Sequence, residues 1–188
     1  MSHNKNKILT ELARSAVKNY IKERKIILPP GNLPKEFLTK KSGVFVTIEK
    51  EGKLRGCIGT YLATKENIAE EIISNAIAAA VEDYRFGPVQ KEELSELSYT
   101  IYILNKPEIV RDIQDLAKFS EEELKQAGLN PKKYGIIVKS GQKSGLLLPG
   151  LEGIYTAKQQ ISIAWQKAGI DQTKEKTTIY RFTAKKYN

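Results

Sequence analysis

The sequence predicts an α+β fold, with an antiparallel, barrel-like sheet formed by two duplicated hairpin–helix–strand units and helices packed outside it. Three observations support this prediction. Segments of alternating apolar residues are typical of strands, and segments with apolar residues three or four positions apart are typical of helices. Glycine, proline and polar clusters separate these segments as turns. The order of hairpin, helix and strand occurs twice along the chain.

The first half of the chain contains five predicted elements. They are a helix over residues 8–24, strands over 43–49 and 53–59, a helix over 65–82 and a strand over 97–104. A Pro-Pro-Gly sequence separates the first helix from the first strand, and the turn Glu51-Gly52 closes the hairpin. Thr64 is expected to cap the second helix, because its side chain can accept a hydrogen bond from a free backbone N–H.

The second half repeats this order after a group of shorter helices that follows Pro107. Ser120 and Glu123 have the spacing of a capping box, which predicts the start of one short helix. Thr156 is expected to cap a longer helix and Gly169 to end it. The remaining predicted elements are strands over residues 135–139, 146–148 and 177–183.

A shift of 92 positions aligns the two halves without a gap. It places Gly43 on Gly135, Val46 on Val138, Leu54 on Leu146 and Thr64 on Thr156. Each copy is followed by a strand that contains Thr-Ile-Tyr. The pattern predicts one repeat over about 43–105 and another over about 135–183, within a single domain of residues 1–188.

Composition and charge limit the function. The formal net charge is +9, but only six of the 31 basic residues are arginines, and the lysines are scattered. A lysine-rich solvated surface is favoured and nucleic-acid binding is disfavoured, with weak, salt-sensitive contact to a polyanion left as an alternative. No apolar run approaches the roughly 20 residues of a membrane span. A single cysteine and a polar N-terminus are typical of a cytoplasmic protein.

The run Leu54-Arg55-Gly56-Cys57-Ile58-Gly59 is the main candidate for chemistry. Because side chains alternate along a strand, Arg55 and Cys57 are expected on one face. Gly56 and Gly59 leave the backbone open to a ligand, and a guanidinium beside the thiol would favour the thiolate. The alternative is structural: a free cysteine is commonly buried and inert, and Arg55 could pair with a carboxylate across the sheet.

The repeat provides an internal comparison for this motif. Under the same shift, Arg55 and Cys57 correspond to Leu147 and Pro149, so the scaffold itself does not require an arginine or a cysteine there. Leu54 corresponds to another leucine and is therefore expected to pack.

The segment 83–88 is the second candidate. Asp83 and Arg85 could pair with each other or with Arg55, and Phe86 is expected to anchor the turn in the core. If this turn faces Cys57, Asp83 could accept a proton or bind a substrate amine. The structural alternative is a helix-end turn held by its aromatic side chain.

Several kinds of site are excluded. The only histidine is His3, so a Cys–His or Ser–His dyad is disfavoured. One cysteine and one histidine cannot form a zinc site, and one cysteine cannot hold an iron–sulfur cluster. The chain has no phosphate-binding glycine-rich loop of the Walker or dinucleotide type. The identity of any cofactor stays unknown from the sequence, and any metal would need carboxylate and carbonyl ligands.

The run Leu54–Gly59 resembles the signature hexapeptide of the AMMECR family. Three further segments support the resemblance: residues 43–47, residues 83–88, and residues 147–149 followed by 167–170. Prokaryotic relatives are called protein A of the AmmeMemoRadiSam system. The resemblance implies an α+β fold of two repeats, a cleft near the hexapeptide, and a role beside a Memo-type protein and a radical S-adenosylmethionine enzyme. Many relatives have His where this chain has Tyr134, so no mechanism through that His is expected.

The leading functional hypothesis is an enzyme, or a component of one, that acts on a small molecule or a protein in a modification pathway. Cys57 and Asp83 are its candidate catalytic residues. The candidate ligand-binding residues are Thr47, Arg55, Gly56, Gly59 and Arg85, and no metal-ligating residues are proposed. A non-catalytic protein-binding adaptor and a basic RNA-associated protein are the alternatives.

Overall fold

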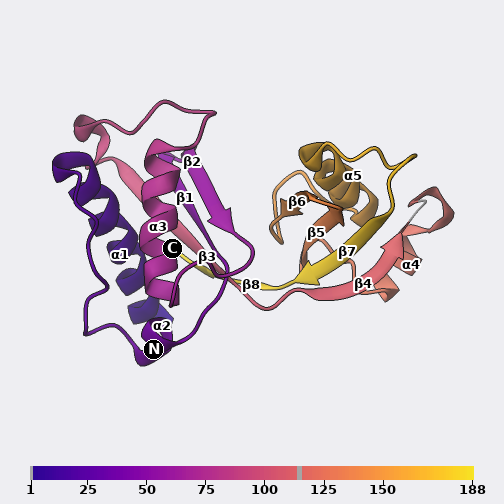
Figure 1. Cartoon of the computed structure of the whole chain (residues 1–188), viewed down its shortest axis with the longest axis horizontal. Helices are drawn as coiled ribbons and strands as arrows, with labels where there is room; N and C mark the ends of the chain where they lie inside the picture. The colour runs from indigo at the N-terminus through magenta and orange to yellow at the C-terminus, as the bar shows by residue number, and fades with distance from the viewer. Residues whose placement is uncertain (1, 114–115) are drawn as a thin grey trace. The chain divides into compact units, whose positions relative to one another are not determined.

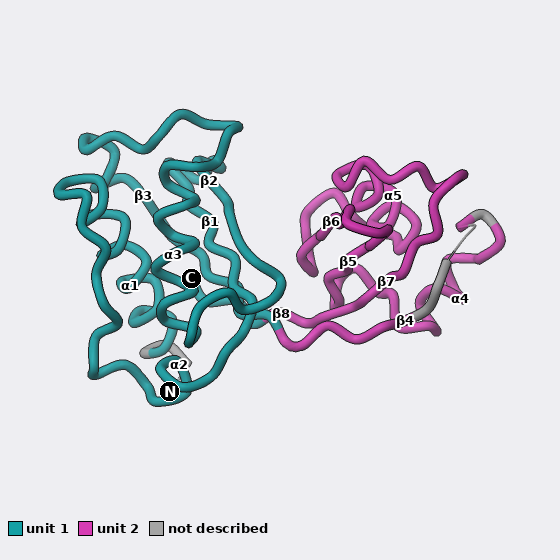
Figure 2. The backbone as a smooth tube through the Cα atoms, viewed as in Figure 1, with its two compact units in different colours: residues 1–104, 185–188 teal, residues 105–184 magenta. Residues whose placement is uncertain are grey.

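The structure is a computed structural model that describes residues 2–113 and 116–188. The chain divides into two compact units, which Figure 2 shows in different colours. Unit 1 contains residues 1–104 and 185–188, and unit 2 contains residues 105–184. The chain therefore passes from one unit to the other twice, after Leu104 and after Ala184.

Unit 1 combines a four-stranded antiparallel sheet with three α-helices in its described residues (Figure 1). The strand order is β2-β1-β3-β8, so β2 is an edge strand. The elements are α1 (Ser2–Glu23), α2 (Lys35–Thr39), β1 (Val44–Lys50), β2 (Lys53–Thr60), α3 (Ile68–Val81), the 3-10 turn η1 (Lys91–Glu93), β3 (Leu97–Leu104) and β8 (Ala184–Tyr187).

The core of unit 1 lies between the sheet and the helices α1 and α3. Val44, Val46 and Ile48 alternate along β1 and are fully buried, as the period of a strand predicts. α3 packs against β1 and β2, and α1 packs against α3 and β3. Thr47 and Cys57, which pair across the hairpin, therefore lie on the face of the sheet that points away from α3.

Unit 2 has a four-stranded antiparallel sheet of order β4-β7-β5-β6. α5 packs on β5 and β6, and Trp165 on this helix is 2% exposed within the core. The elements are β4 (Glu108–Ile113), the 3-10 turn η2 (Leu116–Lys118), α4 (Glu121–Gln126), β5 (Gly135–Ser140), β6 (Lys143–Leu147), α5 (Ala157–Ala168) and β7 (Thr177–Phe182).

The predicted α+β class is confirmed, but the described residues form two open sheets and no closed barrel. The reason lies in β4 and β8, two strands that the sequence analysis did not predict. β4 follows β3 in the chain but pairs with β7 in unit 2, and β8 follows β7 but joins β3 in unit 1. β4 follows the last predicted strand of unit 1 but completes the sheet of unit 2. β8 follows the last predicted strand of unit 2 but completes the sheet of unit 1.

The predicted ends of α4 and α5 are confirmed. Ser120 and Glu123 form a reciprocal capping box at the start of α4. Thr156 caps α5 by accepting a hydrogen bond from the backbone N–H of Gln159. Gly169 follows α5 in the left-handed conformation, with φ of 61°.

The predicted cap of α3 is wrong. Asn67, not Thr64, caps this helix, because its side chain accepts a hydrogen bond from the N–H of Glu70. Thr64 instead donates its backbone N–H and its hydroxyl to Glu71, at 2.7 and 2.9 Å. Glu71 is fully buried and also accepts the hydroxyl of Thr60 at 2.7 Å, so one carboxylate fastens the loop between β2 and α3.

The gapless shift does not match the registers of the two hairpins. The first hairpin turns at residues 51–52 and the second at 141–142, two residues earlier than a shift of 92 requires. Leu54 pairs with Glu49, whereas Leu146 pairs with Ile137. Leu54 is 43% exposed, so its expected packing role is wrong.

Two glycines, Gly56 in β2 and Gly145 in β6, occupy similar positions in the two units. A Cβ atom at Gly56 would overlap the carbonyl oxygen of Ala79 on α3. A Cβ atom at Gly145 would overlap the carbonyl oxygen of Ala164 on α5 in the same way. In each unit a glycine therefore lets the helix backbone lie directly against the hairpin.

Candidate functional site

β2 contains a β-bulge within the candidate motif. Two adjacent residues of β1, Ile48 and Glu49, pair with Gly56 and Leu54, respectively, so Arg55 is an extra residue between them. A bulge bends the strand and changes the direction of its side chains. The β5–β6 hairpin keeps an unbroken register. The bulge therefore interrupts the alternation of side chains along β2 that was expected to place the Arg55 guanidinium and the Cys57 thiol on one face.

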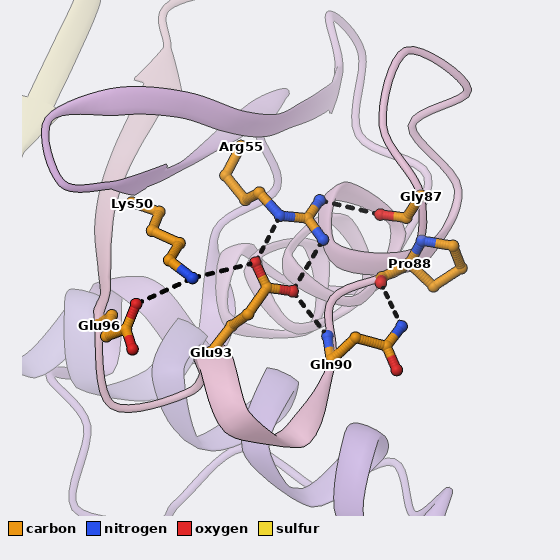
Figure 3. Close-up of polar contacts among 7 residues, drawn as sticks. All are labelled: Lys50, Arg55, Gly87, Pro88, Gln90, Glu93 and Glu96. Carbon is orange, nitrogen blue, oxygen red and sulfur yellow. Dashed lines mark hydrogen bonds and ion pairs between the residues drawn. The ribbon is translucent and has the colours of Figure 1, made fainter.

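Arg55 is held by the segment that precedes β3 (Figure 3). Its Nε and Nη2 donate to Oε1 and Oε2 of Glu93, both at 2.9 Å, and its Nη1 donates to the carbonyl oxygen of Gly87 at 2.9 Å. The side chains of Arg55 and Glu93 are only 17% and 16% exposed, respectively. This is the ion pair that the structural alternative predicted, although the carboxylate comes from η1 and not from across the sheet.

Glu93 is the centre of this cluster (Figure 3). Besides Arg55 it accepts the backbone N–H of Gln90 at 2.9 Å, and Lys50 Nζ lies 3.8 Å from its Oε1. The hydrogen bonds from Arg55 lower the pKa of Glu93 to about 2, against the opposing effect of burial. Glu93 is therefore ionised at neutral pH and ties η1 to β2.

Asp83 and Arg85 form a second pair, on the open edge of β2. Arg85 donates from Nε to Asp83 Oδ1 at 2.9 Å and from Nη2 to Oδ2 at 2.7 Å. The backbone N–H of Cys57 donates to Asp83 Oδ2 at 2.8 Å, and its carbonyl oxygen accepts from Arg85 Nη2 at 3.4 Å. The two side chains thus satisfy backbone groups that an edge strand would otherwise leave unpaired.

The environment of Asp83 makes it a poor proton acceptor. The side chain of Asp83 is 3% exposed, and both of its oxygens accept hydrogen bonds. The bonds from Arg85 lower the pKa of Asp83 to about 2, although burial opposes this effect. The side chain of Arg85 remains 45% exposed, and the neighbouring Tyr84 is 95% exposed. The pair therefore presents a fixed guanidinium to solvent.

Cys57 is a half-buried free thiol. Its Sγ lies 3.4 Å from Oγ1 of Thr47, which is its partner across the hairpin. A threonine hydroxyl is not a base at neutral pH, so this contact does not activate the thiol as a nucleophile. The contact does place a polar group and a polarizable sulfur side by side on the outer face of the sheet.

The motif glycines are covered by protein atoms. Gly56 lies against α3, as described above. A Cβ atom at Gly59 would overlap the ring of Phe45 and the carbonyl oxygen of Val44. Both glycines therefore permit close packing within unit 1, which is a sufficient physical reason for their presence.

The structure brings four of the seven predicted site residues together, namely Thr47, Cys57, Asp83 and Arg85. Arg55 belongs to the adjacent Glu93 cluster. Phe86 is only partly buried, and the turn is instead anchored by Val89, which is 3% exposed. The predicted pairing of Asp83 with Arg85 is confirmed.

Sequence reasoning missed Glu93 and Glu71, the two carboxylates that organise this part of unit 1. Glu93 follows Gln90 at the spacing of a capping box, and the structure contains that box. This signal could have located the turn, but not its partner Arg55, which is distant in sequence. Glu71 lies on an apolar helix and gave no local signal of its buried role.

The structure also bears on metal and membrane binding. Within residues 2–113 and 116–188, no three His, Cys, Asp or Glu side chains are grouped closely enough to hold a metal ion. α1 begins at Ser2 and so includes His3, whose side chain lies outside the described part of the chain. None of the described helices combines the length and apolar character that crossing a bilayer requires.

Comparison with known proteins identifies the relatives of this chain. It is 46% identical over 172 residues to a protein of Thermotoga maritima, with 91% of each chain covered. It is 43% identical over 173 residues to protein CA_C1420 of Clostridium acetobutylicum. The match spans 92% of this chain but only 34% of that relative, so the relative has a large additional part.

A solved structure and a family description agree with these matches. The crystal structure of the uncharacterized protein PH0010 from Pyrococcus horikoshii has a TM-score of 0.83 and 32% sequence identity, covering 99% of this chain and 92% of that one. The sequence description of the AMMECR1 family matches residues 10–187. These matches together show that the chain belongs to the AMMECR1 family.

Proposed function

We propose that the chain is the binding component of a modification pathway, and that it docks an acidic group of a protein partner at the corner formed by Cys57, Tyr84 and Arg85. One observation carries this proposal. The guanidinium of Arg85 is fixed by Asp83, yet 45% of its side chain is exposed beside Tyr84, which is 95% exposed. Tyrosine and arginine are the residue types that dominate the energy of protein interfaces.

The geometry supports binding more than nucleophilic catalysis. A cysteine nucleophile needs a base or a strongly favoured thiolate. Among the described residues, the group within hydrogen-bonding distance of the Cys57 sulfur is the hydroxyl of Thr47. Asp83 is already ionised and accepts hydrogen bonds at both of its oxygens. In this proposal Cys57 forms a wall of the docking corner, and Asp83 positions Arg85. Any catalytic group then comes from the partner.

The partners we propose are a Memo-type protein and a radical S-adenosylmethionine enzyme, as the family resemblance implies. In the longer relative from Clostridium acetobutylicum about two thirds of the chain lies outside the match, so a module like this chain is joined there to a further part of unspecified kind. Linking two modules in one chain raises their effective concentration for each other. A small-molecule substrate would then be bound by the assembly, and this chain alone would act as an adaptor.

Variants of the exposed side chains test this proposal without disturbing the core. Tyr84→Ala is expected to weaken binding to the purified partners roughly tenfold, the size of a moderate interface hot spot. Tyr155→Ala is the matched control, because Tyr155 is also exposed, at 66%, but lies in unit 2. Binding is measured by biolayer interferometry. Equal affinity of the Tyr84→Ala and Tyr155→Ala variants, or no binding to either partner, would contradict the proposal.

Cysteine labelling tests the role assigned to the thiol. Because Cys57 is half-buried and lacks a base, it should react with a maleimide at pH 7 more slowly than a free cysteine in an unfolded control. A Cys57→Ser variant should keep partner binding within about threefold, since the serine fits the same space. A fast-reacting thiol, or loss of pathway activity in Cys57→Ser with binding intact, would restore the nucleophile hypothesis.

We also infer that the two hairpin–helix–strand units arose by duplication. The strand orders β2-β1-β3 and β6-β5-β7 support this inference, as does the glycine that approaches a helix alanine in each unit. In this view Arg55 is an insertion, because β2 bulges at that residue and the β5–β6 register has no bulge. The added residue would then serve to join β2 to η1 through Glu93.

A further inference from the structure

We infer that a groove of unit 1, lined by residues of α1, η1 and β3, binds a small phosphate-bearing molecule. The lining includes four cations and Tyr99; the cations are Arg14, Lys18, Lys22 and Lys91. The volume of the groove is about 360 Å³, and small-molecule sites commonly have about 300–1,000 Å³. This site is separate from the corner at Arg85 and goes beyond the function proposed above.

The cations gather on one side of α1. Arg14, Lys18 and Lys22 follow one another at intervals of four residues, so their side chains share a helix face. Lys91 is supplied by η1, which contacts α1. Like charges at this spacing repel one another, so the cluster is unfavourable until an anion neutralises it.

The charges in the groove are largely uncompensated. Arg14 Nε lies 3.4 Å from Glu11 Oε1. Among the ion pairs of the described residues, none involves Lys18, Lys22 or Lys91. Three of the four cations are therefore available to a ligand.

Tyr99 provides an independent observation that points to a ligand. This residue is 4% exposed, and its hydroxyl oxygen is buried without a hydrogen-bond partner among the described residues. Burial raises the pKa of Tyr99 to about 12, so the hydroxyl keeps its proton at neutral pH. A buried donor without an acceptor is costly, and an anionic oxygen in the groove would satisfy it.

Arg14 lies over the ring of Tyr99. Its guanidinium carbon lies 5.1 Å from the centroid of the Tyr99 ring, and its Nη1 donates to the carbonyl oxygen of Leu97 at 2.9 Å. The Arg14 side chain is 37% exposed and already belongs to the groove lining. A ligand oxygen that draws the guanidinium outward would then reach the phenol.

Phosphate fits this arrangement better than carboxylate does. Four cations are best matched by an anion with more than one charge, and a phosphate monoester carries about two charges and three acceptor oxygens at neutral pH. A carboxylate has one charge and two oxygens. The concave shape of the groove favours a small molecule over an extended nucleic-acid strand, which would need a longer basic track.

Calorimetric titration of the full chain with inorganic pyrophosphate and with ATP, at low salt, tests the inference. Both probes are expected to bind. Lys18→Gln and Tyr99→Phe are each expected to weaken binding about tenfold, the usual effect of losing a hydrogen bond or ion pair to a charged group. Lys7→Gln, an exposed lysine of the same helix outside the groove lining, should change the affinity less than about twofold.

The Tyr99→Phe variant separates binding from folding. Because it removes an unpaired hydroxyl and keeps the ring, its unfolding midpoint in urea should be equal to or higher than that of the unaltered chain. Absence of binding to both probes would overturn the inference, as would an equal loss of affinity in Lys7→Gln. The inference would also be overturned if a single-stranded RNA oligonucleotide bound more tightly than pyrophosphate and ATP, with an affinity unchanged by Tyr99→Phe. That result would favour an RNA-associated function.

Discussion

At the scale of single residues, Asp83 fastens the loop after α3 to the edge of β2. It is buried and accepts hydrogen bonds from Arg85 and from the backbone of Cys57. Asp83→Asn should lower the free energy of unfolding by about 2 kcal/mol, because a hydrogen bond to a charged group contributes roughly 1.5–3 kcal/mol. Urea denaturation measures the change. Glu82→Gln, an exposed neighbour, is the control and should change stability by less than about 0.5 kcal/mol.

The lowered pKa values of Asp83 and Glu93 predict how stability depends on pH. Both values fall to about 2 in the folded chain, from ordinary values of 3.8 and 4.5. As the pH falls, the unfolded chain binds protons first, so stability decreases progressively from about pH 5 to about pH 2. The free energy of unfolding, measured in urea at a series of pH values, should follow this course. The double variant Asp83→Asn, Glu93→Gln should show a flatter dependence, and an identical slope would contradict the assignment.

The sequence predicted which residues belong to the candidate site, but it predicted only some of the ion pairs that these residues form. Asp83 and Arg85 are two positions apart, and their pairing follows from proximity in a turn. Arg55 and Glu93 are joined only by the fold, and a β-bulge in β2 decides where Arg55 lies. Local pattern cannot show a bulge, because its cause is pairing with another strand.

At the scale of elements, the contact between β2 and α3 depends on Gly56. Gly56→Ala should destabilise the protein by about 1–3 kcal/mol, because the added methyl group would overlap the backbone oxygen of Ala79, which cannot move independently of α3. Gly31→Ala is the matched control, since a Cβ atom there meets nothing within 4 Å. Thermal unfolding by circular dichroism measures both variants. Equal melting temperatures would show that α3 adjusts to the methyl group.

Most elements were predictable because their signals are local. The caps at Ser120, Thr156 and Gly169 are side-chain or backbone features of one or two turns, and all three are present. β4 and β8 were missed because they lie where the chain passes between units, and tertiary pairing outweighs local propensity there. The short helix α2 was also missed, since it begins directly after Pro34 in a segment that read as a loop.

At the scale of the whole molecule, unit 1 depends on the last residues of the chain. Tyr187 on β8 is 4% exposed, and its ring lies 6.3 Å from that of Phe37 in an edge-to-face arrangement. Tyr187→Ala should therefore cost about 3 kcal/mol, as large-to-small changes in cores do. Lys186→Ala, an exposed neighbour on the same strand, is the control.

The single tryptophan distinguishes the two units in this experiment. Trp165 is buried in unit 2, so its fluorescence reports on that unit, whereas far-ultraviolet circular dichroism reports on both. Tyr187→Ala should lower the urea midpoint seen by circular dichroism more than the midpoint seen by fluorescence. Superimposable shifts would mean that the units unfold together, and an unchanged dichroism midpoint would mean that β8 is dispensable.

The exchange of β4 and β8 has a consequence for the order in which the ribosome makes this protein. Unit 2 begins after Leu104, and all of its residues have been synthesised once Ala184 is added. Residues 1–104 of unit 1 are made before unit 2, but unit 1 also needs residues 185–188, which are made after unit 2, to fill the edge beside β3. The unit that is translated first is thus the last that can finish folding, and a nascent chain stalled at Ala184 would carry a complete unit 2 and an unfinished unit 1.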